Sequence, residues 1–285
     1  MNHFVELKDI SYSYTQGSKN RVFAVKDVNF NLNKGEIVGI IGHTGSGKST
    51  LISVFNGLLK PASGSVFVDG QDIFQDKKTL YNVKFKVGIC FQYPEYQLFE
   101  ETVFKDIAFG PKNMKLTSDE VKQRVISAAR YCDISEEMLN KSPFELSGGE
   151  KRRVAVAGVM AMNPDILILD EPAAGLDPAG RTKLIGLIRD YNRTTGSAVI
   201  IVSHNMEEVC SLCERVVVVN KSKIVLDSAL DDVFSHSEML SSIGLDVPDV
   251  TKLFLKLKAA GVDLPTDVYT PEQAAEILKP LINRR

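Results

Sequence analysis

The sequence lacks any apolar run long enough to span a bilayer. Its longest apolar stretches, such as 154–162 and 216–219, fall well short of the roughly 20 residues that a membrane-spanning helix needs. The first residues also lack the basic flank and the apolar stretch of a secretory signal. These absences predict a cytoplasmic chain that would meet a membrane only through a partner.

Cysteine is scarce and charge is nearly balanced. The 285 residues include four cysteines, mostly in apolar segments, which favours buried thiols in a reducing compartment. Cys210 and Cys213 have the spacing of a metal or redox pair, but they fall in an expected helix without a second ligand pair, so we interpret them as packing residues. With 34 basic and 36 acidic residues, the net charge of −2 gives no general reason to expect a nucleic-acid partner.

The chain does contain a glycine-rich phosphate-binding motif. Residues 42–50 read GHTGSGKST and match the P-loop pattern G-x-x-x-x-G-K-[ST], in which backbone N–H groups surround phosphates at the start of a helix. Lys48 would contact the β- and γ-phosphates, and the Ser49 hydroxyl would bind Mg²⁺. His43 occupies a variable position, and no chemical role is expected for it. The candidate nucleotide ligands are Gly42, His43, Thr44, Gly45, Ser46, Gly47, Lys48, Ser49 and Thr50.

Short apolar runs predict a wound α/β core around this motif. Residues 37–41 are continuously apolar and lead directly into the P-loop, as a buried parallel strand would. Further apolar runs alternate with helical patterns and lie at 87–91, 166–169, 198–202 and 216–219. The N-terminal stretches 4–7, 22–25 and 28–32 instead alternate between apolar and polar residues, which predicts half-exposed antiparallel strands.

A second glycine segment and several polar residues at strand ends complete the pattern. Residues 146–150 read LSGGE, and Asp170 and Glu171 follow an aliphatic run. Gln92 and His204 each follow another apolar run. In order and spacing these motifs resemble the ATP-binding cassette (ABC) family of ATPases over roughly residues 4–228. The resemblance implies an α/β P-loop NTPase fold with an N-terminal antiparallel β subdomain, and ATP as the nucleotide.

The strand ends would supply the residues of hydrolysis. Asp170 leaves a buried strand where its carboxylate can reach the Mg²⁺ held by Ser49. The resemblance implies that Glu171 activates the attacking water, that Gln92 contacts Mg²⁺ and this water, and that His204 contacts the γ-phosphate. The expected Mg²⁺ ligands are Ser49, Gln92 and Asp170, and the expected catalytic residues are Lys48, Gln92, Glu171 and His204.

The second glycine segment predicts a helix start that faces an anion. Ser147 and Glu150 have the spacing of a capping box, which would leave the N–H groups and positive end of the helix dipole free. Because the P-loop already embraces one face of the triphosphate, the resemblance implies that Ser147, Gly148, Gly149 and Glu150 act on the ATP of another subunit in a head-to-tail dimer. Asp177 matches the loop that crosses to that subunit. Glu150 replaces the family's commoner Gln and can make the same cap.

An aromatic residue near the N-terminus is the expected partner of the adenine base. Tyr14 is the first choice, and Tyr12 is the alternative. Aromatic stacking tolerates any base, so it predicts nucleotide binding more firmly than a choice of ATP.

The segment after Gln92 narrows the subgroup. Residues 91–103, FQYPEYQLFEETV, and 108–113, AFGPKN, are similar to the ATPases of energy-coupling factor (ECF) transporters, a group that includes cobalt import ATP-binding proteins. The resemblance implies a peripheral ATPase on the cytoplasmic face of the cell membrane. Its partners would be a transmembrane coupling subunit, a substrate-binding subunit and a second copy or a paralogue of the ATPase. The cargo would be cobalt, nickel or a vitamin. The choice among them stays open, because a separate membrane component would select the cargo.

Several alternatives stay open at this point. A soluble ABC ATPase of iron–sulfur assembly or of DNA maintenance is the other function considered, although no sustained heptads predict the coiled coils of the DNA-repair class. The large apolar residues after Gln92 are Tyr93, Tyr96, Leu98 and Phe99. They either form a docking surface for a membrane subunit or pack inside a helical subdomain, which we expect at about 93–160.

The end of the chain should form a separate helical extension. We expect the nucleotide-binding domain at 1–228 and the extension at 229–285, with amphipathic helices around 250–257 and 271–281. Thr270 and Gln273 form a predicted capping box at the second helix. These helices cover either their own domain or a second copy of the chain, as a dimerisation element.

Overall fold

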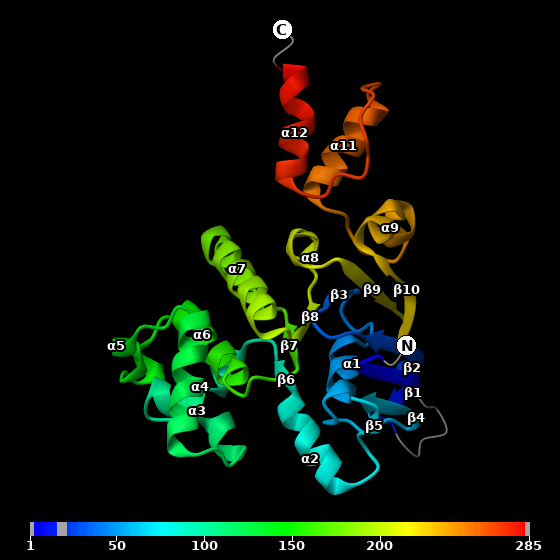
Figure 1. The fold of residues 1–285 in the computed structure, drawn as a ribbon. Helices are drawn as coiled ribbons and strands as arrows, with labels where there is room; N and C mark the ends of the chain where they lie inside the picture. Colours follow the sequence, from blue (N-terminus) through cyan, green and yellow to red (C-terminus); the bar gives the residue numbers. More distant parts are fainter. Residues whose placement is uncertain (1–2, 16–21, 283–285) are drawn as a thin grey trace.

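A six-stranded sheet forms the centre of the molecule in the computed structural model, which describes residues 3–15 and 22–282 (Figure 1). From one edge to the other, its strands are β10 (Lys223–Ala229), β9 (Arg215–Asn220), β3 (Ile37–Ile41), β8 (Ala198–Val202), β7 (Ile166–Asp170) and β6 (Val87–Cys90). All pairs are parallel except that of β10 with β9. The apolar runs predicted as buried strands are therefore confirmed, and the carboxyl ends of five parallel strands share one edge.

A second, antiparallel sheet lies beside the first. Its order is β2 (Phe23–Leu32), β1 (Val5–Ser13), β4 (Ser63–Val68) and β5 (Gln71–Asp72). The antiparallel prediction for the N-terminal stretch is confirmed, but the two runs expected within 22–32 form one strand. The backbone of Asp27 has a φ of 50°, and the pairing of β1 with β2 shifts register in this region, so an irregularity interrupts the alternation without ending the strand.

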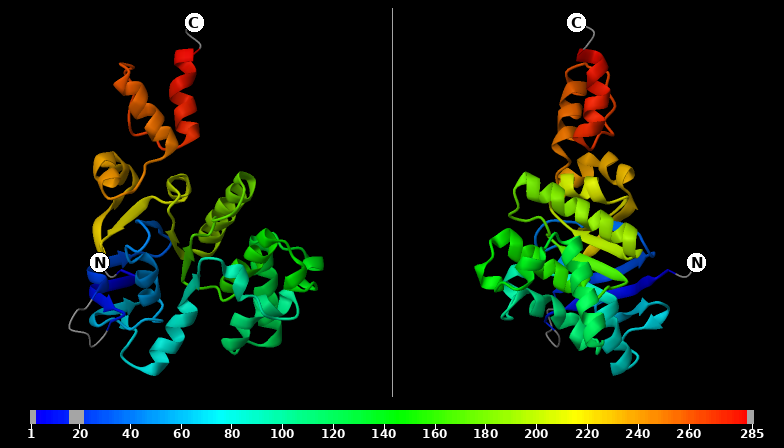
Figure 2. Two further views of the ribbon diagram at one scale, coloured as in Figure 1. Left: turned by 180° about the vertical axis from the view of Figure 1, so that it is seen from behind. Right: turned by 60° about the vertical axis from the view of Figure 1, so that its left-hand side comes forward.

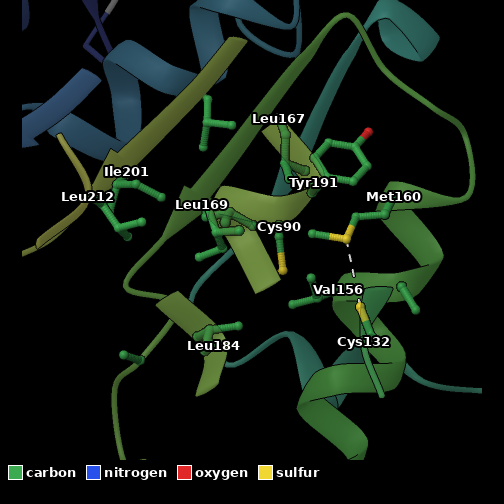
Figure 3. Packing of buried hydrophobic residues seen from close by; sticks show 14 of the residues in the cluster. Cys90, Cys132, Val156, Met160, Leu167, Leu169, Leu184, Tyr191, Ile201 and Leu212 are labelled. Carbon is green, nitrogen blue, oxygen red and sulfur yellow. Dashed lines mark hydrogen bonds between the residues drawn. The ribbon is translucent and has the colours of Figure 1, made fainter. Parts of the chain in front are cut away.

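The central sheet has a different set of partners on each face. Helix α1 (Lys48–Phe55) buries Leu51 and Phe55 in a cluster with the antiparallel sheet and one face of the central strands. On the other face pack α6 (Gly148–Met160), α7 (Pro178–Thr195) and α8 (Met206–Leu212). Figure 3 shows this second cluster, where Val156 and Met160 of α6 lie against Cys90, Leu167 and Leu169 of the sheet.

Most of the chain between β6 and β7 is helical. It contains η1 (Pro94–Gln97), α3 (Val103–Asn113), α4 (Ser118–Tyr131), α5 (Glu136–Leu139), η2 (Pro143–Glu145) and α6. These elements lie together on one side of the sheet, at the lower left of Figure 1. A further helix, α2 (Lys77–Lys86), comes directly before β6 in the chain. The helical pattern predicted for this part of the sequence is present, and it is held to the core mainly through α6.

The last helices pack chiefly on each other. After α9 (Leu230–Ser235) and α10 (Ser237–Ser242), helices α11 (Asp249–Ala259) and α12 (Pro271–Ile282) project together from the rest of the chain (Figure 2). Their small cluster is centred on Phe254, Leu264 and Val268. The predicted capping box is confirmed, because the Gln273 amide N–H donates to Thr270 Oγ1 at 3.3 Å and Gln273 Oε1 accepts from the Thr270 N–H at 3.1 Å.

The cysteines pack as predicted. Cys213 is buried at the end of α8 and Cys210 is half-buried within it, and burial raises the pKa of the Cys210 thiol to about 12. Within the described residues, no three His, Cys, Asp or Glu side chains are placed to hold a metal ion. No helix in the described part of the chain has the length and apolar character needed to cross a membrane.

Candidate nucleotide-binding and hydrolysis site

A cavity of about 770 Å³ opens at the carboxyl ends of the central parallel strands. The predicted site residues that line it are Tyr14, Gly42, His43, Thr44, Gly45, Gly47, Lys48, Ser49, Thr50, Gln92, Asp170, Glu171 and His204. Ser46 does not line it, because its side chain is buried below the loop and its carbonyl accepts from the Ser222 N–H at 3.0 Å. The structure thus brings together residues from five separate parts of the sequence.

Glycine is required at both ends of the P-loop. Gly47 has a φ of 111°, and a Cβ there would lie 2.1 Å from the carbonyl oxygen of Ala24. A Cβ on Gly42 would lie 2.3 Å from the carbonyl oxygen of Val219. Any side chain at either position would collide with rigid backbone. The loop can therefore pass close to its neighbouring strands only if both positions are glycine.

Lys48 is folded back over the loop. Its ammonium donates to the carbonyl oxygens of Gly42 at 2.6 Å and His43 at 3.1 Å. Burial lowers the pKa of Lys48, and the nearby carboxylates of Glu171 and Asp170 oppose this shift. A cation held here by neutral carbonyls can exchange them for phosphate oxygens, which offer a stronger charge-assisted bond.

His43 connects the P-loop to the adjacent strand. One ring nitrogen, Nδ1, lies 2.7 Å from the carbonyl oxygen of Thr44, and the other, Nε2, lies 3.2 Å from Oδ1 of Asn220 at the end of β9. The prediction assigned no chemical role to this residue. The contacts indicate that its part is to brace the loop.

Ser49 and Asp170 meet at the base of the cavity. The Ser49 hydroxyl donates to Asp170 Oδ2 at 3.2 Å, although 121 residues separate the two in sequence. Asp170 ends β7 and is 7% exposed. Burial raises its pKa, the Ser49 hydrogen bond opposes this, and the charge of Glu171 adds to the increase. The charge of Lys48 also opposes the increase, so two carboxylates share one nearby cation at this point of the site.

Glu171 and His204 face each other across the ends of β7 and β8. His204 Nδ1 lies 2.6 Å from Glu171 Oε2, and the Glu171 N–H donates to the Val202 carbonyl oxygen at 2.8 Å. Glu171 has a φ of 52°, which non-glycine residues rarely adopt. This backbone turn, which the sequence did not reveal, sets the direction of the carboxylate.

A buried acid supports the segment that carries His204. The Ser203 hydroxyl donates to Glu208 Oε2 at 2.6 Å and accepts from the Asn205 N–H at 3.0 Å. Burial raises the pKa of Glu208, which is 2% exposed. Sequence reasoning missed Glu208, although the Asn205-x-x-Glu208 spacing is typical of a helix cap, and the Asn205 side chain does accept from the Glu208 N–H at 2.9 Å.

The two candidate stacking tyrosines occupy different environments. Tyr14 lines the cavity with 66% of its surface exposed, and its hydroxyl lies 3.1 Å from Thr50 Oγ1. Tyr12 is buried and packs edge-on against it, with ring centroids 5.0 Å apart. Only Tyr14 has a ring face free for a base.

The LSGGE segment caps α6 as predicted. Glu150 Oε2 accepts from the Ser147 N–H at 2.8 Å and from its hydroxyl at 2.7 Å, while Ser147 Oγ accepts from the Glu150 N–H at 3.4 Å. The pKa of Glu150 is lowered chiefly by its bond with the Ser147 hydroxyl. Asp177 caps α7 by accepting from the Gly180 N–H at 2.7 Å. Neither Ser147 nor Asp177 lines the cavity of its own chain.

Two further features of the cavity concern its surroundings. Gly244, Leu245 and Asp246, which follow α10, also line it, and no sequence motif indicated this. On another side, Gln92 lines the cavity and is followed directly by exposed aromatic side chains. Tyr93 is 47% exposed, and Tyr96 is 84% exposed.

Comparisons with known proteins agree with this arrangement. The family model described as ABC transporter matches residues 25–174, and one described as AAA domain, putative AbiEii toxin, Type IV TA system matches residues 139–210. The chain is 50% identical over 272 residues to the Energy-coupling factor transporter ATP-binding protein EcfA2 of Caldanaerobacter subterraneus subsp. tengcongensis, with 95% of each chain covered. The chain belongs to the energy-coupling factor transporter ATP-binding proteins. The EcfA2 protein of Clostridium tetani is 46% identical, with 99% of this chain and 98% of the relative covered.

Solved structures place this ECF-type ATPase among known cassettes. The structure of cbiO1 from Clostridium perfringens, described as part of the ABC transporter complex cbiONQ, has a TM-score of 0.76 and 36% identity and covers 92% of this chain and 98% of its own. A dimeric post-hydrolysis state of the ATP-binding cassette MJ0796, bound to ADP and Pi, has a TM-score of 0.71 and 29% identity over 79% of this chain and 98% of its own.

Family membership establishes the coarse function. This ECF-type protein binds and hydrolyses ATP, and the predicted α/β P-loop fold is confirmed. The iron–sulfur assembly and DNA-maintenance alternatives are thereby set aside.

Proposed function

We propose that this ECF-type ATPase is the energy-coupling subunit of an importer, bound peripherally at the cytoplasmic face of the cell membrane. It takes ATP into the cavity described above and transmits the closing and opening of an ATPase dimer to transmembrane partners. The observation that carries the proposal is that Gln92, at the cavity, is continuous with the exposed aromatics of η1 and its flanks.

Ser49, Asp170 and Gln92 would hold Mg²⁺. The fit rests on the Ser49 hydroxyl at 3.2 Å from Asp170 Oδ2 and on the raised pKa of Asp170, whose charged form is disfavoured by burial. Hydroxyl, carboxylate and amide oxygens are the ligands that Mg²⁺ prefers. When bound, Mg²⁺ neutralises charge on the β- and γ-phosphates.

The remaining cavity residues each have a separate role in ATP binding or hydrolysis. Glu171 accepts the proton of the attacking water, a role that typically contributes about 10²–10⁴-fold to the rate. His204, 2.6 Å from Glu171, orients this carboxylate and contacts the γ-phosphate. Lys48 binds the β- and γ-phosphates, and Tyr14 stacks on the base.

A second subunit completes each site. Ser147 is exposed at the start of α6 and is remote from its own cavity, so its helix end is available to the γ-phosphate of a neighbour. Gly148, Gly149 and Glu150 belong to the same helix start, and Asp177 crosses in the same way. The neighbour is a second copy or a paralogue, arranged head to tail.

The docking surface is formed by Tyr93, Tyr96 and Phe99, whereas Leu98 is half-buried and packs against the core. The three aromatic residues are 47%, 84% and 58% exposed, so a core role would leave about half or more of each residue in water. Tyr93 and Tyr96 lie side by side, with ring centroids 6.2 Å apart, and exposed aromatics next to a ligand-sensing residue favour contact with a partner. We therefore favour docking of a membrane subunit over packing inside the helical region.

Tyr96→Asp tests this role directly. The expected result is loss of co-purification with the membrane subunits from detergent extracts, while the melting temperature of the isolated chain changes by less than about 2 °C, because surface substitutions cost little. Val225→Asp is the matched control: Val225 is 45% exposed on β10, at the opposite edge of the sheet, and should retain assembly. Normal melting with retained co-purification of Tyr96→Asp would refute docking at this surface.

Cobalt is the first candidate cargo, with nickel or a vitamin as alternatives. A separate membrane component would select the cargo, so the assembled complex must be examined. We expect elemental analysis of the complex purified from its native membrane to find cobalt. Nickel, or an organic vitamin found by mass spectrometry without either metal, would reassign the cargo and leave the ATPase role intact.

A further inference from the structure

A buried arginine joins three parts of the ATPase. Arg152 lies on α6, on the same helix as the Ser147 cap, and is 4% exposed. Its Nη1 donates to the carbonyl oxygen of Ala174, in the loop that connects Glu171 to Asp177. Its Nε lies 3.4 Å from Oε2 of Glu95, in η1 between Tyr93 and Tyr96.

The other ion pairs of the helical region differ from this one. Among the described residues, Lys105 with Glu101, Lys141 with Glu137 and Lys183 with Asp133 all have side chains that are at least 44% exposed. The side chains of Arg152 and Glu95 are 5% and 19% exposed. Exposed pairs contribute little to stability, and a buried charge must be matched by its surroundings.

The match around Arg152 is incomplete. Within the described part of the chain, its Nε and Nη2 are buried and make no hydrogen bond to protein atoms, and neither does Glu95 Oε2. A guanidinium has five N–H donors, and burying it with donors unpaired costs free energy. The side chain also borders a small cavity of about 40 Å³ between α6 and α7. Free donors and adjacent space allow the guanidinium to change acceptors when the surrounding segments move.

We propose that Arg152 is a positioning residue that couples the docking surface to α6, which the LSGGE segment begins, and to the loop carrying Glu171 and Asp177. A shift of Glu95 by a bound membrane subunit pulls on Arg152, which moves the Ala174 carbonyl and α6 together. The inference rests on the proposed docking function. It adds the physical connection by which that contact reaches both the water-activating carboxylate and the residues presented to the other subunit.

A double-mutant cycle on the complete transporter tests the connection. The tagged chain is purified with its membrane subunits, and kcat and KM for ATP are measured for Arg152→Gln, Glu95→Gln and the double variant. Each single variant is expected to lower kcat about tenfold, within the range of coupling between sites, and to leave KM within about twofold. The double variant should be no slower than Arg152→Gln, because both changes break one link.

Two further variants separate coupling from folding. Lys105→Gln removes an exposed pair in the same helical region and should leave kcat unchanged. Arg152→Lys keeps the charge beside Glu95 without the forked guanidinium and should restore part of kcat. If Arg152→Gln does not fold, Arg152→Lys replaces it in the double-mutant cycle with Glu95→Gln.

The outcomes are distinct from those of the docking test. Three results would overturn the coupling role of Arg152. They are a double variant whose loss of kcat equals the product of the two single losses, a wild-type kcat in Glu95→Gln, and a KM that rises as kcat falls. If the unmodified chain fails to bring down membrane subunits, the docking function fails. The same cycle on the kcat of the isolated ATPase then still decides whether Arg152 and Glu95 act as one unit.

Discussion

His204 Nδ1 lies 2.6 Å from Glu171 Oε2, so the side chains of these two strand-end residues are in direct contact. The pairing of β7 with β8 is parallel, which places both strand ends at one edge. The left-handed backbone of Glu171, with a φ of 52°, then turns its carboxylate toward His204. Such a conformation costs on the order of 1–3 kcal/mol and is typical of functional sites.

Glu171→Gln is expected to retain ATP binding and to lose hydrolysis. An amide keeps the shape of the side chain and cannot accept a proton from water, so kcat should fall by about 10²–10⁴-fold. ATP should then accumulate unhydrolysed in closed dimers, which size-exclusion chromatography with ATP and Mg²⁺ would detect. Glu207→Gln, on the adjacent α8 and outside the cavity lining, is the control. Near-normal hydrolysis by Glu171→Gln would remove Glu171 from the role of base.

Mixing two inactive variants tests the shared site. Ser147→Arg should block a partner's site and spare its own P-loop, whereas Lys48→Ala should disable its own P-loop and spare its LSGGE segment. In a mixed dimer one composite site keeps both normal halves, so an equal mixture should regain about a quarter of the normal activity if subunits pair at random. A mixture as inactive as either parent would contradict head-to-tail self-association and favour a paralogous partner.

Tyr14→Ala is expected to weaken nucleotide binding through loss of stacking. The change should raise the Kd for ATP by an amount equivalent to about 1–3 kcal/mol, and the Kd for GTP by a similar factor, because stacking tolerates either base. Tyr14→Phe keeps the ring and loses only the contact with Thr50 Oγ1, so it should remain close to the unmodified chain. Fluorescent-nucleotide titration measures all three. An unchanged Kd for Tyr14→Ala would assign the base to another surface.

Local pattern in the sequence was sufficient for much of the fold. The strands Ile37–Ile41 and Ala198–Val202 lie where their apolar runs predict, and the Ser147 cap forms as its spacing predicts. These features depend on neighbouring residues, so periodicity and spacing encode them. The short strand β5 carries no comparable pattern in its two residues, Gln71 and Asp72, and was missed.

Buried polar contacts were not predictable in the same way. Arg152 and Glu95 meet only once distant segments have packed, and no periodicity marks such a pair. Ser203 and Glu208 are five residues apart, but their contact depends on the turn from β8 into α8. Motif order identified Asp170 and Ser49 as common members of one site, whereas their hydrogen bond and the raised pKa of Asp170 depend on burial in the folded chain.

The raised pKa of Asp170 lowers the stability of the folded chain at neutral pH. Burial disfavours the Asp170 carboxylate, so the folded chain holds its proton more tightly than the unfolded chain does. The free energy of unfolding therefore decreases as pH rises from the unfolded-state pKa through the raised folded-state pKa, and the deficit persists at neutral pH. A bound cation would offset it, which is the usual exchange of stability for function at an active site.

Asp170→Asn is accordingly expected to stabilise the nucleotide-free chain while abolishing Mg²⁺-dependent hydrolysis. Removing the buried charge should raise the melting temperature at pH 7 by about 2–4 °C, which corresponds to about 1 kcal/mol for a chain of this size. The gain should shrink as the pH falls through the raised pKa, where the normal carboxyl is itself protonated. Asp263→Asn, in the exposed loop after α11, should show no gain at either pH. Calorimetry at both pH values would refute the assignment if Asp170→Asn proved less stable than the unmodified chain at pH 7.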